Sequence, residues 1–107
     1  MGITVVTNWQ IVTVINEDRE LVGSVLYADV VDDSTFRFSQ GDYVCTSKIE
    51  AVDVYNSLVH TTSGSIYQLL EKGTVASIAI EDFELLRNGF SPNDIHHMNA
   101  VKDQLQH

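Results

Sequence analysis

Cys45 and His60 are the two residues of this sequence best suited to nucleophilic chemistry. A neighbouring imidazole can lower the pKa of a thiol and turn it into a nucleophile. Cys45, however, falls in a run that alternates like a strand, and a cysteine in a strand is typically a small buried side chain. No motif of a cysteine-enzyme family surrounds it. The absence of a catalytic constellation favours a non-enzymatic protein, with Cys45 and His60 as weak catalytic candidates.

Acidic side chains near two expected turns are the candidate binding residues. They are Glu17, Asp18 and Glu20 in the first turn, and Asp29, Asp32 and Asp33 around the second. The chain carries 15 Asp and Glu against six Lys and Arg, a formal net charge of -9, which repels nucleic-acid phosphates and anionic lipids. The expected partner is therefore a basic surface of another protein. Because the two turns flank one expected hairpin, the sequence leaves open whether these carboxylates form one patch.

Asp32 and Asp33 are expected to be exposed turn charges, which contribute little to stability. Reversing both to lysine should therefore slow association with the partner and leave the fold intact. The alternative interpretation is a solvated turn that binds nothing.

No metal site or cofactor is expected. His96 and His97 are neighbours on an expected helix, where adjacent side chains project about 100° apart and cannot easily ligate one ion. Cys-x-x-Cys, His-x-x-x-His and calcium-loop patterns are absent from the sequence.

Alternation with a period of two predicts a strand-rich body up to residue 80, and helical spacing follows it. The expected strands are 4–15, 21–31, 36–38, 43–49, 52–61, 65–70 and 75–80, and the expected helices are 81–87 and 92–105. The predicted fold class is α+β: a small antiparallel β-barrel or a twisted sheet, followed by two short C-terminal helices. We expect one domain over 1–107, with a β body at 1–80 and a helical end at 81–107.

Two expectations concern packing. Trp9 shares a strand face with Ile11 and Ile15 and should lie at least partly in the core. The second helix should begin at a Ser91 cap followed by Pro92. Its apolar stripe should dock on the sheet; the stripe comprises Ile95, Met98, Val101 and Leu105.

The chain is expected to reside in the cytoplasm and to have no membrane span. No segment reaches about 18 consecutive apolar residues, and the first residues lack the pattern of a signal peptide. Cys45 is the single cysteine, so no internal disulfide can form, which fits a reducing compartment. Homo-oligomerisation stays open.

Two segments carry a resemblance to other proteins. They are Arg-Phe-Ser-Gln-Gly-Asp-Tyr-Val-Cys-Thr-Ser at 37–47 and Thr-Thr-Ser-Gly-Ser-Ile-Tyr at 61–67. The combination resembles small uncharacterised proteins carried by bacterial prophages and other mobile elements. The resemblance implies a bacterial accessory role and names no catalytic residue.

Three functions of different classes follow. The first is a non-enzymatic interaction module or inhibitor with an acidic face. The second is a ligand-binding or enzymatic barrel whose pocket gathers Tyr43, Tyr67, Cys45 and His60. The third is a nucleic-acid-associated regulator, since residues 86–95 resemble a helix-turn-helix corner, although the acidic charge disfavours it.

Overall fold

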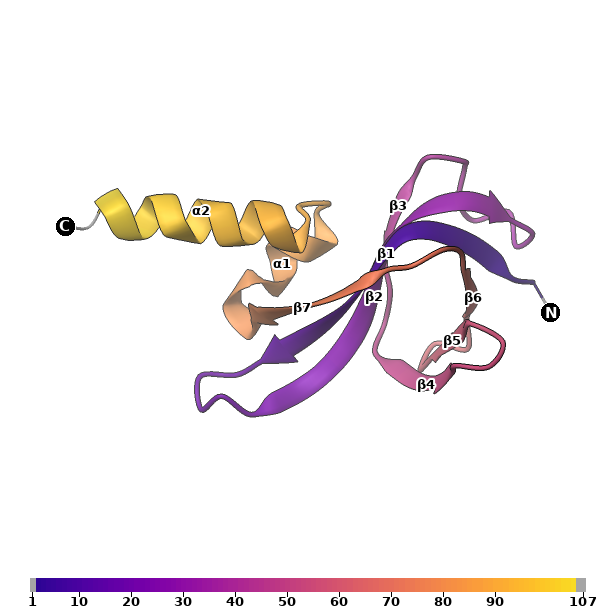
Figure 1. Cartoon of the computed structure of the whole chain (residues 1–107), viewed down its shortest axis with the longest axis horizontal. Helices are drawn as coiled ribbons and strands as arrows, with labels where there is room; N and C mark the ends of the chain where they lie inside the picture. Colours follow the sequence, from indigo (N-terminus) through magenta and orange to yellow (C-terminus); the bar gives the residue numbers. More distant parts are fainter. Residues whose placement is uncertain (1, 106–107) are drawn as a thin grey trace.

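The computed structural model describes residues 2–105 and shows a strand-rich body with a helical end (Figure 1). The strands are β1 (Thr4–Ile15), β2 (Leu21–Asp33), β3 (Tyr43–Cys45), β4 (Ile49–Asp53), β5 (Leu58–Thr61), β6 (Ile66–Leu69) and β7 (Thr74–Ala79). A 3-10 turn, η1 (Ile80–Asp82), leads into α1 (Phe83–Arg87), and α2 (Pro92–Leu105) follows. The two short C-terminal helices that the sequence predicts after a strand-rich body are present.

The strands form one mixed, twisted sheet of seven strands that does not close into a barrel. Its order is β3-β2-β1-β6-β5-β4, and β7 also pairs with β1. The α+β class and the twisted sheet are thus confirmed, whereas a closed and wholly antiparallel arrangement is wrong. Both β6 and β7 run parallel to β1, β6 along its first half and β7 along its second half. β6 and β7 therefore act as one interrupted strand along the edge of β1.

A bulge in β1 decides which core each part of this strand serves. The register with β2 shifts between Thr7 and Gln10, and the intervening Asn8 has a φ of 50°. One extra residue moves the alternation to the opposite face of the sheet. Val6 and Val12 are six residues apart and would share a face of a regular strand. Because of the bulge, Val6 belongs to one core cluster and Val12 to the other.

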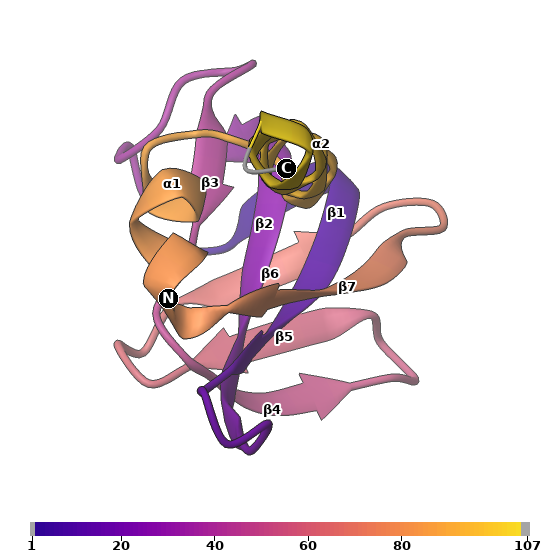
Figure 2. The same ribbon diagram turned by 90° about the vertical axis from the view of Figure 1, so that its left-hand side faces the viewer.

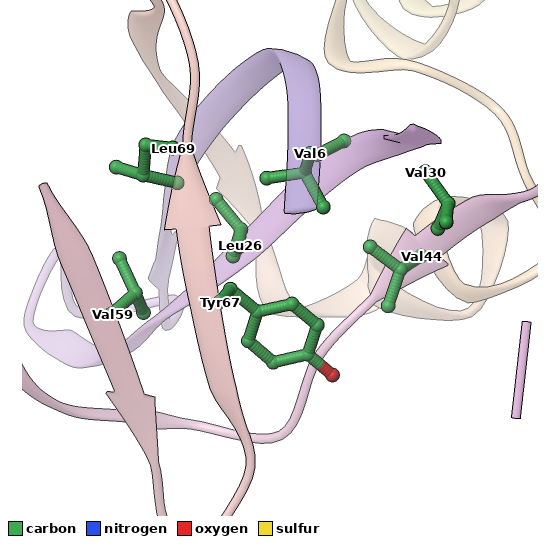
Figure 3. Packing of buried hydrophobic residues seen from close by; sticks show 8 residues of the cluster. Val6, Leu26, Val30, Val44, Val59, Tyr67 and Leu69 are labelled. Carbon is green, nitrogen blue, oxygen red and sulfur yellow. The ribbon is translucent and has the colours of Figure 1, made fainter. Parts of the chain in front are cut away.

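The first core lies between the β1–β2–β3 part of the sheet and the β5–β6 part. Figure 3 shows its side chains meeting from these strands, with Tyr67 reaching from β6 toward Val44 on β3. The buried members are Val6, Leu26, Ala28, Val30, Val44, Val59, Tyr67 and Leu69. Trp9 packs against this cluster and is partly buried, as predicted.

The second core joins the other face of the β1–β2 hairpin to the helices. Val25 of β2 belongs to it, whereas its neighbour Leu26 belongs to the first core, as expected for successive residues of a strand. Leu86 of α1 and Ile95 of α2 are both 0% exposed in this cluster. The helices are therefore anchored to the sheet by these two apolar side chains.

Only the first part of α2 is anchored, which corrects the predicted docking of the whole stripe. Ser91 and Asp94 cap the helix reciprocally, because each side chain accepts a hydrogen bond from the backbone N–H of the other. Beyond Ile95 the stripe is exposed, from Met98 at 39% to Leu105 at 80%. Figure 1 shows α2 running away from the sheet, and Figure 2 shows it end-on above the strands.

Two predicted strands differ in the structure. Residues 36–38 form a loop, because the Asp33 carboxylate accepts hydrogen bonds from the backbone N–H groups of Arg37 and Phe38 and so competes with strand pairing. The predicted strand 43–49 is split after Cys45. There the Thr46 hydroxyl takes the hydrogen bond of the Leu26 N–H, and the chain leaves β2 to form β4 beside β5.

A further predicted strand, 52–61, is interrupted by a turn. The side chain of Asp53 accepts hydrogen bonds from the backbone N–H and the side-chain amide of Asn56, which closes the turn between β4 and β5. The expected run therefore contributes the end of one strand and the whole of the next.

Candidate functional site

A groove of about 400 Å³ lies where the β2–β3 loop, β3, the β5–β6 turn and the end of α1 meet. We call it the arginine groove. It is lined by Arg37, Phe38, Tyr43, Val44, Cys45, Thr46, Ser47, Ser63, Tyr67 and Arg87. No acidic side chain is among these residues, although the chain carries 15 Asp and Glu. The arginine groove is therefore a local basic site on an acidic protein.

Arg37 is held at the groove by neutral partners. Its Nε donates a hydrogen bond to Thr35 Oγ1 at 2.9 Å, and one terminal nitrogen donates to Ser65 Oγ at 3.0 Å. The guanidinium carbon lies 5.0 Å from the centroid of the Phe38 ring. Within residues 2–105 this guanidinium forms no ion pair. It is linked to the Asp33 carboxylate only through the hydroxyls of Thr35 and Thr4, so its remaining N–H groups can donate to an anionic ligand.

Asp33 lies behind Arg37 and fixes the loop that carries it. Its carboxylate accepts hydrogen bonds from the hydroxyls of Thr4 and Thr35 and from the backbone N–H groups of Thr35, Arg37 and Phe38, at 2.6 to 3.0 Å. Burial acts to raise the pKa of Asp33, but the hydrogen bonds from Thr35, Thr4 and Phe38 outweigh it and hold that pKa well below the usual range. Asp33 is thus a structural residue of the loop.

Arg87 approaches from the end of α1. Tyr43 places it, because the Tyr43 hydroxyl donates a hydrogen bond to the backbone carbonyl of Arg87 at 2.8 Å. The guanidinium of Arg87 pairs with Glu84 at 3.0 Å, and both side chains are more than half exposed. Such an exposed pair is weak. Arg87 is therefore a secondary source of positive charge in the groove.

Hydroxyl groups form a chain along the wall between the two ends of the groove. Ser47 Oγ donates to Ser63 Oγ at 3.0 Å, and Ser63 Oγ lies 3.5 Å from Ser65 Oγ, which accepts from Arg37. Hydroxyls both donate and accept hydrogen bonds and can rotate to suit a ligand. The wall can therefore offer donors to an anion that the arginines attract.

Three of the four residues expected in a shared pocket lie together in the arginine groove. Tyr43, Tyr67 and Cys45 line it, whereas His60, in the middle of β5, does not. No hydrogen bond joins His60 to Cys45 in the described part of the chain. Burial raises the pKa of the Cys45 thiol to about 11, against a smaller opposing influence of Arg87. Cys45 is therefore a protonated thiol at neutral pH.

The acidic candidates lie at opposite ends of the β1–β2 hairpin. Glu17, Asp18 and Glu20 are exposed in the turn that joins the two strands. At the far end of β2, Asp32 is exposed, while Asp29 is half-buried and accepts a hydrogen bond from Asn8 Nδ2 at 3.1 Å. A strand rises about 3.3 Å per residue, so β2 places Asp29 about 30 Å and Asp32 about 40 Å from Glu20. The six carboxylates do not form one patch.

Sequence reasoning missed both arginines of the groove. Arg37 entered the sequence analysis only within the segment 37–47, which resembles other proteins. Arg87 entered it only as the last residue of the expected helix 81–87. The signal that could have drawn attention to them is the small number of cationic side chains. The chain has six Lys and Arg, and two of them line this groove. Their approach in space depends on the β2–β3 loop and on the docking of α1, which local patterns do not specify.

Among residues 2–105 no three His, Cys, Asp or Glu side chains gather as a metal site would require. The same residues contain no helix with the length and apolar character needed to cross a membrane.

Comparisons with known proteins give a family and no activity. No curated protein and no solved structure matches the chain. One family, described as Domain of unknown function (DUF6957), matches residues 1–85, which include the whole sheet and all residues of the arginine groove except Arg87. Because the match covers most of its 107 residues, the chain belongs to the DUF6957 family.

Proposed function

We propose that this protein is a non-enzymatic binding module whose arginine groove receives an anionic group. The observation that carries the proposal is that Arg37, Arg87 and two serine hydroxyls line one groove whose lining includes no acidic residue, on a chain of net charge -9. A guanidinium presents a planar fork of donors that fits carboxylate and phosphate oxygens. The volume of about 400 Å³ is within the range of small-molecule sites.

A binding role is favoured over catalysis by the state of the one thiol. With a pKa of about 11, Cys45 has little thiolate at neutral pH, and His60 is not placed to activate it. The anion is either a free small molecule or an acidic or phosphorylated side chain of a partner. In both cases the chemistry in the groove is the same. The bacterial accessory role implied by the resemblance is compatible with either source.

Titration with sodium phosphate, followed by amide chemical shifts, tests the proposal. Phosphate should shift the resonances of Ser47, Ser63 and the Arg37 loop. Arg37→Gln should weaken binding about tenfold, since a charge-assisted hydrogen bond contributes about 1.5 kcal/mol or more. Arg87→Gln should weaken it less, because Glu84 already pairs with Arg87.

Arg19→Gln is the matched control, because it removes the same charge from the exposed β1–β2 turn. It should leave phosphate affinity within about twofold, apart from a small long-range effect. A folded Arg37→Gln variant that binds phosphate as tightly as the unmodified chain would rule the proposal out. Phosphotyrosine, as free amino acid and in a short peptide, then separates a small-molecule ligand from a side chain of a partner.

A further inference from the structure

A second groove lies on the other side of the chain segment that follows β3. We call it the valine groove, and its volume is about 330 Å³. Val14, Val22 and Val25 form one wall, and Ile80 and Phe83 form another, so four elements of the fold contribute to it. Its surface is almost wholly apolar, and the segment Thr46–Lys48 closes one side.

The apolar side chains of the valine groove are in part exposed to water. Val22 is 45% exposed and Ile80 is 43% exposed, beside the buried Val14 and Val25. Exposed apolar surface of this kind has a free-energy cost that a bound apolar group removes. The volume is at the lower end of the range for small-molecule sites. The groove therefore fits a narrow apolar group better than a bulky one.

Lys48 is the one charged residue that lines the valine groove. Its alkyl stem lies over Gly23, where an added Cβ would meet Lys48 Cε at 3.2 Å and Cγ at 3.3 Å. The glycine thus leaves room for the stem to lie across β2, with the ammonium group at the end of the stem. Within residues 2–105 no carboxylate forms an ion pair with Lys48. The groove therefore combines an apolar trough with one available positive charge.

We propose that the valine groove binds an aliphatic chain that ends in an anionic head group, with the chain against Val22, Ile80 and Phe83 and the head group at Lys48. Charge complementarity selects the head group. The chain carries nine more acidic than basic groups, yet none of its acidic residues lines this groove. The charge at the lining of the groove is therefore that of Lys48, which attracts an anionic head group and repels a cationic one. The valine groove shares Thr46 and Ser47 with the arginine groove, but Val22, Lys48 and Ile80 line the valine groove alone, so the two proposals do not depend on each other.

Sodium octanoate, used below the concentration at which it forms micelles, is the probe, and amide chemical shifts report its binding. Octanoate should shift the resonances of Val22, Ile80 and Phe83. It should bind about fifteenfold more tightly than hexanoate, which is the ratio given by two methylenes at ~0.8 kcal/mol each. Octanol, which lacks the charge, should bind more weakly than octanoate. Equal affinity for octanol and octanoate would overturn the role given to Lys48.

Matched variants locate the two parts of the site. Val22→Asp should weaken octanoate binding at least tenfold, and Val75→Asp, the same change on the exposed face of β7, should leave it unchanged. Lys48→Gln should weaken octanoate but not octanol, with Lys102→Gln on α2 as its control. Since Lys48 has an exposed side chain, its variant keeps the test valid even if Val22→Asp does not fold.

Two outcomes would overturn the inference. In the first, the affinity for octanoate is unchanged in Val22→Asp and is lost in Arg37→Gln. The anion would then bind in the arginine groove. In the second, octanoate does not shift the resonances of Val22 and Ile80, but an increase in protein concentration does. A second copy of the chain would then cover the groove. Phosphate binding to the arginine groove can succeed or fail independently of both.

Discussion

The indole of Trp9 lies against Gly73, so closely that a Cβ at Gly73 would overlap the ring. The indole Nε1 donates to the carbonyl of Leu70 at 3.0 Å and is 3.3 Å from that of Glu71. Leu70, Glu71 and Gly73 lie in the loop that connects β6 to β7, the two strands that pair with β1 one after the other. The bulge at Asn8 turns Trp9 toward this loop. Trp9 therefore occupies the interruption in the strand that flanks β1.

Gly73→Ala should lower the free energy of unfolding by about 1 to 3 kcal/mol, since the added methyl group must displace the indole. Trp9→Ala should cost roughly 3 kcal/mol for the large side chain that it removes. In the Trp9→Ala background the Gly73→Ala change should cost almost nothing, because the overlap is gone. A double-mutant cycle by urea unfolding measures this coupling, and simple additivity of the two costs would contradict the contact.

Asp33→Asn should destabilise the protein at neutral pH by about 1 to 2 kcal/mol, because an amide nitrogen cannot accept the hydrogen bonds that the carboxylate takes. The folded pKa of Asp33 is below its unfolded value. Its contribution is therefore present above the unfolded pKa of about 3.9 and is lost as the pH falls through the folded pKa. Unfolding measured from pH 7 to pH 2 should show a smaller loss in the variant than in the unmodified chain.

Asp32→Asn is the matched control, because the neighbouring side chain is exposed and takes none of these hydrogen bonds. It should change stability by less than about 0.5 kcal/mol. Equal stability of the two variants would contradict the role of Asp33. The same contacts correct the expectation that Asp33 can be reversed to lysine without harm to the fold.

Much of the strand layout could be predicted, but the joins between strands could not. Period-two alternation predicts the bounds of β1 and the start of β2 correctly. It does not predict which side chains of β1 are buried, because Val6, Val12 and Val14 fill the cores while Ile11 and Ile15, on the expected inner face, stay partly exposed.

Asp33 ends the pattern locally, because its carboxylate accepts hydrogen bonds from the backbone of the loop that follows it. Thr46 breaks the next strand through a hydrogen bond from the Leu26 N–H, a partner distant in the sequence that local patterns do not specify. The arginine groove escaped prediction for the same reason. Arg37 and Arg87 line one groove only after the loop has formed and α1 has docked.

Cys45 should react slowly with iodoacetamide in the folded protein. With a pKa of about 11 its thiolate fraction at pH 7.5 is small, so labelling should be roughly 300-fold slower than for an unperturbed thiol of pKa about 8.5. The rate should rise with pH up to about 11, and unfolding in urea should restore ordinary reactivity. Arg87→Gln should slow labelling further, since Arg87 favours the thiolate. Rapid labelling of the folded chain at neutral pH would restore the nucleophile hypothesis.

The acidic turn between β1 and β2 is still a predicted contact for a basic protein. Reversal of Glu17 and Glu20 to lysine should weaken capture of basic proteins from a bacterial lysate and flatten its dependence on salt, because all three acidic side chains of this turn are exposed. Asp32→Lys, at the other end of β2, tests whether the second group contributes. If neither variant changes capture, the carboxylates are solvated turn residues.

The two ends of α2 should differ sharply in their effect on stability. Ile95 is 0% exposed in the second core, so Ile95→Ala should lower the free energy of unfolding by about 2 to 5 kcal/mol. Val101 lies on the same predicted stripe but is 41% exposed, beyond the part of the helix that the sheet supports. Val101→Ala should change stability by less than about 0.5 kcal/mol, helped by the higher helix propensity of alanine. Urea unfolding of the two variants compares them directly. A large loss for Val101→Ala would mean that the outer half of α2 packs against the sheet or against another copy in solution, and a dependence of that loss on protein concentration would identify the second case.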